Sequence, residues 1–204
     1  LYQSGQSPES PKPTEREEAY PELWDKMPQG ILHLLAESES SFVQEFAVKA
    51  AKNNQQKILN LINIDFVKVL LQKRYEDTAR FGLDLAKQKY KANEPDIDLI
   101  NTLLNVKLPE ARRQGIAWVD EQRNHFLNEA DFVIGLLFNS FEDVNIWTDE
   151  LLSVASFSKE KSQVIIARAI ALIMSYGENA TEEEKQKILT AGNFITRHFQ
   201  ILGH

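Results

Sequence analysis

The chain has 204 residues, of which 43% are hydrophobic and 26% charged, so it is long enough to bury a core without metals or disulfides. It contains no cysteine, which excludes disulfide bonds, thiolate zinc sites and a cysteine nucleophile. Its net charge of −7 and pI near 5.2 argue against broad binding to nucleic acid or to anionic membranes, because both require a positive protein field.

The N-terminal segment differs in composition from the rest of the chain. Residues 1–14 are rich in Ser, Pro and Gln, which predicts a disordered lead, and the first five residues match a cloning scar. The segment has no basic start followed by an apolar stretch, as a secretory signal would. We therefore expect a disordered lead over residues 1–14 and a single all-α domain over residues 15–204, located in the cytoplasm.

A short helix is predicted directly after this lead. Four apolar residues at spacings of 0, 3, 4 and 7 form one face of a two-turn helix, which Pro21 starts and Pro28 stops. A free helix of two turns is not stable, so this face must pack on something. It either folds back onto the body of the chain or docks into a groove on another protein. We take its four apolar residues as candidate partner-binding residues, with the tryptophan as anchor: Tyr20, Leu23, Trp24 and Met27.

Further helices are predicted from apolar residues at helical spacing. They begin after Ser40 or Ser41, at Asp65 (a long helix to about Ala92), at Asp96, at Pro109, at Asn128, at Val144, at Ser158 and at Thr181. The last of them opens with a capping box formed by Thr181 and Glu184.

Two of these segments are apolar nearly all round, which predicts central helices buried on every side: Asn128–Phe141 and Val164–Met174. The fold class expected is all-α, an irregular bundle of about seven to nine helices around these two. It is neither a coiled coil nor a solenoid, since we find no period of 30–45 residues. No apolar run is long enough to span a membrane, because Arg168 interrupts the longest one.

The strongest cluster of possible metal ligands is Glu121, His125, Glu129 and Asp131. On a continuous helix the first three would share one face, because they are four residues apart. The Glu-x-x-His pairs of di-iron bundles, the His-Glu-x-x-His of zinc proteases and the glycine-rich phosphate loops do not occur. We expect no catalytic residues, no metal and no cofactor, and surface ion pairing for this cluster.

Arg168 is the single charge within Val164–Met174. An unpaired guanidinium in a buried helix would be costly, so it either pairs with a carboxylate such as Glu129, Asp131 or Asp143 or reaches solvent. The alternative is a functional role as a groove anchor for a carboxylate of a partner protein.

The function that these patterns favour is a non-catalytic, all-α adaptor or chaperone-like subunit of a larger protein assembly. It would bind a protein or peptide helix, for example in a bacterial secretion or regulatory machine. The many Asn, Ile and Lys residues are typical of AT-rich bacteria. Two alternatives remain open. One is a secreted bacterial effector or immunity protein that acts by binding; the other is a helical metal-dependent hydrolase that uses the Glu121–Asp131 cluster.

Overall fold

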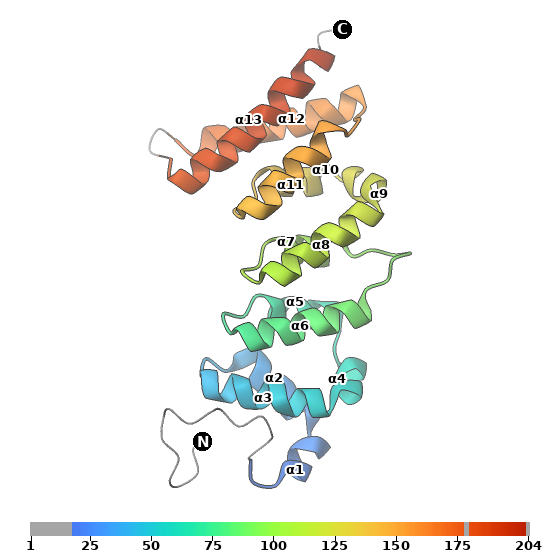
Figure 1. Ribbon diagram of the computed structural model, residues 1–204, viewed down its shortest axis with the longest axis vertical. Helices are drawn as coiled ribbons and strands as arrows, with labels where there is room; N and C mark the ends of the chain where they lie inside the picture. Colours follow the sequence, from blue (N-terminus) through green and yellow to red (C-terminus); the bar gives the residue numbers. More distant parts are fainter. Residues whose placement is uncertain (1–17, 178–179, 203–204) are drawn as a thin grey trace. The chain divides into compact units, whose positions relative to one another are not determined.

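The computed structural model describes residues 18–177 and 180–202, and every regular element in that part of the chain is an α-helix (Figure 1). The predicted all-α fold class is therefore confirmed. Thirteen helices are present among the described residues, against the expected seven to nine. The predicted disordered lead over residues 1–14 lies outside the described residues.

The helices group into two compact units, one within residues 1–91 and one within residues 92–204. The single domain over residues 15–204 stays a prediction, and each unit is described by itself. The first unit contains α1 (Pro21–Lys26), α2 (Pro28–Glu37), α3 (Ser41–Asn53), α4 (Gln55–Leu61), α5 (Ile64–Leu71) and α6 (Glu76–Lys89). The second contains α7 (Ile97–Leu104), α8 (Pro109–Glu121), α9 (Arg123–Leu127), α10 (Ala130–Leu137), α11 (Glu142–Ser153), α12 (Lys159–Ser175) and α13 (Glu182–Leu202).

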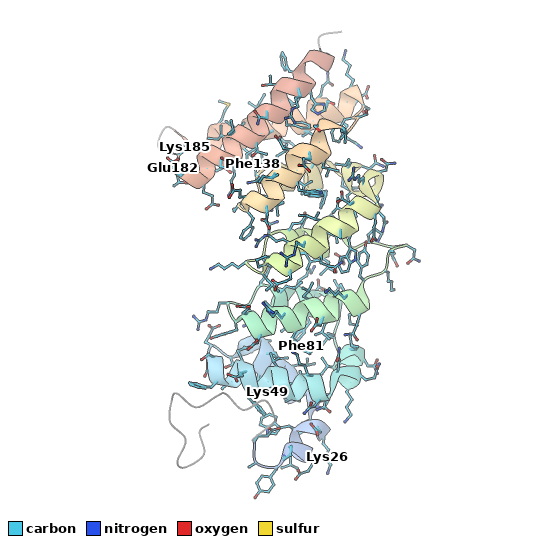
Figure 2. The ribbon with its side chains drawn as sticks, in the orientation of Figure 1. Lys26, Lys49, Phe81, Phe138, Glu182 and Lys185 are labelled. Carbon is cyan, nitrogen blue, oxygen red and sulfur yellow. The ribbon has the colours of Figure 1, made fainter. Side chains whose placement is uncertain are left out.

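Within each unit, consecutive helices form hairpins that pack on one another in order. In the first unit α2 packs on α3 and α5 on α6, while α2 also contacts α5 and α3 contacts α6. Phe81 of α6 is buried in this unit (Figure 2). In the second unit α7 pairs with α8, α10 with α11 and α12 with α13, and α10 packs on both α7 and α12. First helices thus lie against first helices, as in helical-repeat proteins.

Three of these hairpins recur at a constant spacing along the chain. The first helices α5, α7 and α10 begin at Ile64, Ile97 and Ala130, so the step from the first start to the second equals the step from the second to the third. The second helices α6, α8 and α11 keep the same step. We call this step the hairpin period. The expectation that no period of 30–45 residues recurs is therefore wrong, and the helices within each unit are arranged more regularly than predicted.

Residues of the same kind recur at equivalent positions of the three hairpins. An aspartate in the first turn of each first helix suits the positive end of the helix dipole: Asp65, Asp98 and Asp131. Each first helix ends on a buried Leu-Leu pair, at residues 70–71, 103–104 and 136–137. These pairs and the residues facing them across the hairpin supply much of the local core.

In two of the hairpins, α2–α3 and α7–α8, a buried polar side chain at the fourth residue of the second helix joins the hairpin to its neighbours. In α3 this residue is Gln44, which is 1% exposed. Its Nε2 donates to the carbonyl oxygens of Leu34, Leu35 and Ser38, at 3.2, 3.1 and 2.8 Å, and so satisfies the open end of α2. Its Oε1 accepts a 2.8 Å hydrogen bond from Thr78 Oγ1 of the next hairpin.

Arg112 occupies the same position in α8. Its Nη1 donates to the carbonyl oxygens of Val106 and Lys107, at 2.8 and 3.0 Å, in the loop after α7. Its Nε lies 2.9 Å from both carboxylate oxygens of Asp143 in the next hairpin, and its guanidinium lies 4.1 Å from the centre of the Phe141 ring. Arg112 therefore joins the end of its own hairpin's first helix to the next hairpin, as Gln44 does in the first unit, although the two side chains differ in chemistry.

Several predicted helix ends are confirmed, and others move. The capping box forms as expected, with Glu184 N donating to Thr181 Oγ1 at 3.2 Å and Thr181 N donating to Glu184 Oε2 at 2.7 Å. Asn63, not Asp65, caps α5, since Asn63 Oδ1 accepts from Phe66 N at 2.9 Å. The predicted long helix after Asp65 is broken between α5 and α6, where the chain turns back on itself.

The two predicted central helices are not confirmed as such. The segment 128–141 yields only the two-turn α10, of which Phe132, Val133, Ile134, Leu136 and Leu137 are buried. In α12 only one face is buried, through Ser162, Ile165, Ile166 and Ala169. Its other face is exposed, because α10 and α13 cover the same side of the helix.

Candidate functional site

The predicted short helix exists as α1, and it is fastened to the first unit. The ring of Trp24 packs edge-on against Phe46 of α3, with the ring centres 5.2 Å apart. Asp25 Oδ1 accepts a 2.5 Å hydrogen bond from Asn54 Nδ2, and the Asp25 carbonyl oxygen accepts one of 2.9 Å from Lys57 Nζ. These contacts fix one side of α1 on the middle of α3 and on the junction of α3 and α4.

The other side of α1 is exposed. The exposed fractions are 68% for Tyr20, 54% for Leu23 and 63% for Met27. Leu23 belongs to α1, whereas Tyr20 and Met27 are the residues that cap its two ends, and the half-buried Trp24 packs inward. We call Tyr20, Leu23 and Met27 the α1 surface. Exposed apolar side chains gathered on one face mark binding sites more often than scattered ones do.

The backbone at the start of α1 is strained. Tyr20 has φ 60° and ψ 55°, the left-handed conformation, and it is the one non-glycine residue with positive φ in the described part of the chain. This conformation costs a bulky residue about 1 kcal/mol or more, so the surrounding contacts must hold it. Such strain is found preferentially at functional sites.

Sequence reasoning proposed that this helix either folds back or docks on another protein. The structure separates the four predicted residues into two roles. Trp24 folds back onto the chain and contacts α3, while Tyr20, Leu23 and Met27 stay exposed, and their role as partner-binding residues stays a prediction. Pro28, expected only to stop the first helix, is also the first residue of α2, where its missing N–H and fixed φ are well tolerated.

The possible metal ligands lie on three separate elements. Glu121 is the last residue of α8, His125 belongs to α9 and Glu129 precedes α10, so the continuous helix assumed for this cluster does not exist. Residues 18–177 and 180–202 contain no group of three or more His, Asp or Glu side chains placed to hold a metal ion.

Arg168 forms an ion pair with Asp131 of α10, one of the three carboxylates considered for it. Its side chain is 47% exposed, because the face of α12 that carries it is open to solvent. The role of groove anchor stays a prediction. The pair is a partly exposed one, so its contribution to stability is modest.

Sequence reasoning missed a second exposed apolar surface, the outward face of α12. Val164 is 48% exposed and Met174 78% exposed, although both belong to the segment predicted to be buried all round. Apolar periodicity could not have revealed this, because a helix that is apolar on every side does not indicate which side lacks a neighbour.

None of the helices in the described ranges is long and apolar enough to cross a membrane. A comparison of the chain with protein-family models, curated proteins and solved structures gives no match.

Proposed function

We propose that this chain is a non-catalytic, protein-binding adaptor or chaperone-like subunit of a larger assembly in the cytoplasm, such as a bacterial secretion or regulatory machine. The observation that carries the proposal is the α1 surface. Leu23 of α1 and its two cap residues, Tyr20 and Met27, are more than half exposed, and an aromatic contact and two hydrogen bonds fix the helix between them.

The arrangement supports binding without a large ordering cost. A free two-turn helix would have to fold on contact, and that entropy would reduce the affinity. Here Trp24 and Asp25 already hold α1 against α3 and α4. The apolar face is therefore preorganised for its partner, and loss of conformational freedom on binding is confined to the three side chains.

The partner that fits this surface is an amphipathic helix of another protein. Such a helix presents apolar side chains at i, i+3, i+4 and i+7, and these can contact Leu23 together with the cap residues Tyr20 and Met27. Phe42 extends the apolar character onto α3, since it is 61% exposed and lies one turn before the Phe46 that contacts Trp24.

A photo-crosslinking experiment tests the proposal. Leu23 is replaced by p-benzoylphenylalanine in the full chain, expressed in cells of the native organism, and Gln88, an exposed residue of α6, is replaced in the same way as the control. We expect a discrete protein adduct from position 23, none from position 88, and loss of the adduct in the variant Tyr20→Asp/Met27→Asp. An equal yield from both positions, or an adduct that survives the double variant with an unchanged melting temperature, would refute the proposal.

A further inference from the structure

Successive hairpins within a unit are joined by side-chain hydrogen bonds at two positions. The first position is the fourth residue of the second helix. In the first unit Gln44 of α3 accepts a hydrogen bond from Thr78 of the next hairpin. In the second unit Arg112 of α8 donates to Asp143 of the next hairpin. Both Gln44 and Arg112 are buried, so each places a directional bond inside the packed junction.

The second position lies two residues after the Leu-Leu pair that ends a first helix. Here Lys73 Nζ donates to the carbonyl oxygen of Ala36, in the last turn of α2. Two hairpin periods further on, Asn139 Nδ2 donates to the carbonyl oxygen of Leu104, the last residue of α7, at 3.0 Å. Each bond thus joins the start of a hairpin's turn to the first helix of the hairpin before it.

A short helix also occupies the connection at each of these two junctions. The helix α4 lies between α3 and α5 in the chain and packs on α2 and α3. The helix α9 lies between α8 and α10 and packs on both. The junction inside the first unit and the junction from α7–α8 to α10–α11 therefore share three features: two polar links and a helical connection.

The step from α5–α6 to α7–α8 has different residues at all three places. Ala79 is the fourth residue of α6, and Val106 occupies the second position after α7. Neither side chain has a donor or an acceptor, so neither can form the hydrogen bond that its equivalents form. In the described chain, residues 90–96, which connect α6 to α7, contain no helix, and residues 91–94 are exposed.

We propose that residues 90–96 are a hinge about which the two compact units turn. Hydrogen bonds hold packed helices in one register because they depend on direction, whereas contacts of apolar side chains such as Ala79 and Val106 do not. A non-helical connection can absorb the changes in φ and ψ that a hinge requires. The boundary between the compact units, after Lys91, falls within this same segment.

The last junction of the second unit shows that a non-helical connection is not enough to make a hinge. The residues between α11 and α12 also contain no helix. There, however, the ion pair of Arg168 with Asp131 joins α12 to α10, and the ion pair of Arg197 with Asp149 joins α13 to α11. The same helices also share one buried apolar cluster. A hinge therefore needs the loss of the polar links as well as a loose connection.

The hinge changes the direction of the first unit, which carries the α1 surface, without the unfolding of any helix. Relative motion of this kind is the usual behaviour of compact units that are not fastened to each other by specific contacts. The inference rests on the residues at the junctions, so it holds whatever the α1 surface binds.

Distances between pairs of nitroxide labels, measured by pulsed electron paramagnetic resonance on the full chain, test the proposal. The absence of cysteine allows each labelled pair to be introduced alone. Arg80, Arg113 and Ile146 are exposed, and each is the fifth residue of its helix, so successive positions are one hairpin period apart. The pair Arg80→Cys/Arg113→Cys spans the hinge, and the pair Arg113→Cys/Ile146→Cys spans the next junction as the matched control.

We expect the distance distribution of the hinge pair to be at least about two-fold wider than that of the control pair, because only the hinge pair samples several orientations. Distributions of equal width would overturn the proposal.

A second experiment tests whether the polar links are the cause. The double variant Arg112→Ala/Asn139→Val gives the control junction the same residue types as Ala79 and Val106. It should widen the distribution of the control pair toward that of the hinge pair. If the double variant does not fold, Asn139→Val alone serves for the comparison. A folded variant, judged by unchanged circular dichroism, whose control pair stays as narrow as in the wild type would overturn the proposal.

Discussion

At the scale of single residues, His198 is the buried titratable group with the most constrained surroundings. It is 6% exposed and lies between the rings of Phe157 and Phe194, whose centres are 5.5 and 4.3 Å from its own. Burial lowers the pKa of His198; a hydrogen bond with the Leu152 backbone opposes the shift, and the nearby charge of Arg197 adds to it. Its Nδ1 has no hydrogen-bond partner in the described structure.

This environment predicts that the chain loses stability in mild acid. The unfolded chain takes up a proton near the ordinary histidine pKa of 6.5, whereas the folded chain resists it because its pKa is lowered. The unfolded state therefore binds more protons, and stability falls as the pH drops below about 6.5 toward the lower pKa of the folded state. Thermal melting between pH 7.5 and 5.5 should show a larger loss for the wild type than for His198→Gln. Parallel curves would rule out His198 as the source, since the carboxylates titrate equally in both proteins.

At the scale of elements, two of the hairpins have a glycine where their helices cross. A Cβ placed on Gly82 of α6 would lie 3.0 Å from Leu70 Cβ and from the backbone N of Leu71, and one on Gly115 of α8 would lie 3.1 Å from Leu104 Cδ2. The two glycines are equivalent, one hairpin period apart, and the third hairpin has the buried Thr148 there. Absence of a side chain at this position sets the distance between the two helices.

Gly82→Ala should therefore destabilise the protein, although alanine is the better helix former. The gain in helix propensity is about 1 kcal/mol, but the contact with backbone atoms forces α5 and α6 apart, at a cost of about 1–3 kcal/mol or more. The control is Gly192→Ala in α13, where a Cβ would meet nothing within 4 Å, and this change should stabilise. The measurement is the urea unfolding free energy of both variants. If both substitutions stabilise to the same degree, α5 and α6 do not cross as tightly as described.

At the scale of the whole molecule, each compact unit has its own hairpins and its own core, and the segment that joins α6 to α7 contains neither helix nor strand. Lys91, Ala92, Asn93 and Glu94 in this segment are exposed. A protease needs an extended stretch of several residues, which this segment can supply without the unfolding of a helix.

Limited digestion with trypsin should therefore cut early after Lys91 and release the two units as fragments of similar length. Lys107 is the matched control, since it is also exposed but its carbonyl oxygen accepts from Arg112 and both adjoining residues, Val106 and Leu108, are buried. Mass spectrometry of the first products checks the order. Cleavage at Lys107 before Lys91 would contradict the division into units.

The sequence predicted the helical class and many helix ends well, because these depend on local patterns. The Thr181–Glu184 capping box and the helix start at Asp96 each depend on a hydrogen bond between residues three positions apart, so a short stretch of sequence is enough to predict them. The α2 helix was missed because Pro28 looked like a stop when it is also a start. The hairpin period could have been predicted from the sequence, because an aspartate and a Leu-Leu pair recur at this spacing; the pairs are at residues 70–71, 103–104 and 136–137.

The candidate surfaces were predictable only in part. Spacing identified the apolar row of α1, but it could not show that Trp24 would turn inward while Leu23 stays outside, since that depends on the position of Phe46 in another helix. The exposure of one side of α12 could not be predicted for the same reason. The exposure of a side chain depends on which other elements pack against it, and a short stretch of sequence does not contain those elements.

The register of the hairpins also has a consequence for how such a chain can grow. An extra copy of residues 97–129, inserted before Ala130, would bring each helix start back to its equivalent place. Arg112 of the original copy could then form an ion pair with Glu110 of the inserted copy, because Glu110 occupies the position in its hairpin that Asp143 occupies in the next one. Arg112 of the inserted copy would keep Asp143. The second unit can thus lengthen by gene duplication one hairpin at a time, and each added hairpin carries an acceptor for the arginine before it and an arginine for the acceptor after it.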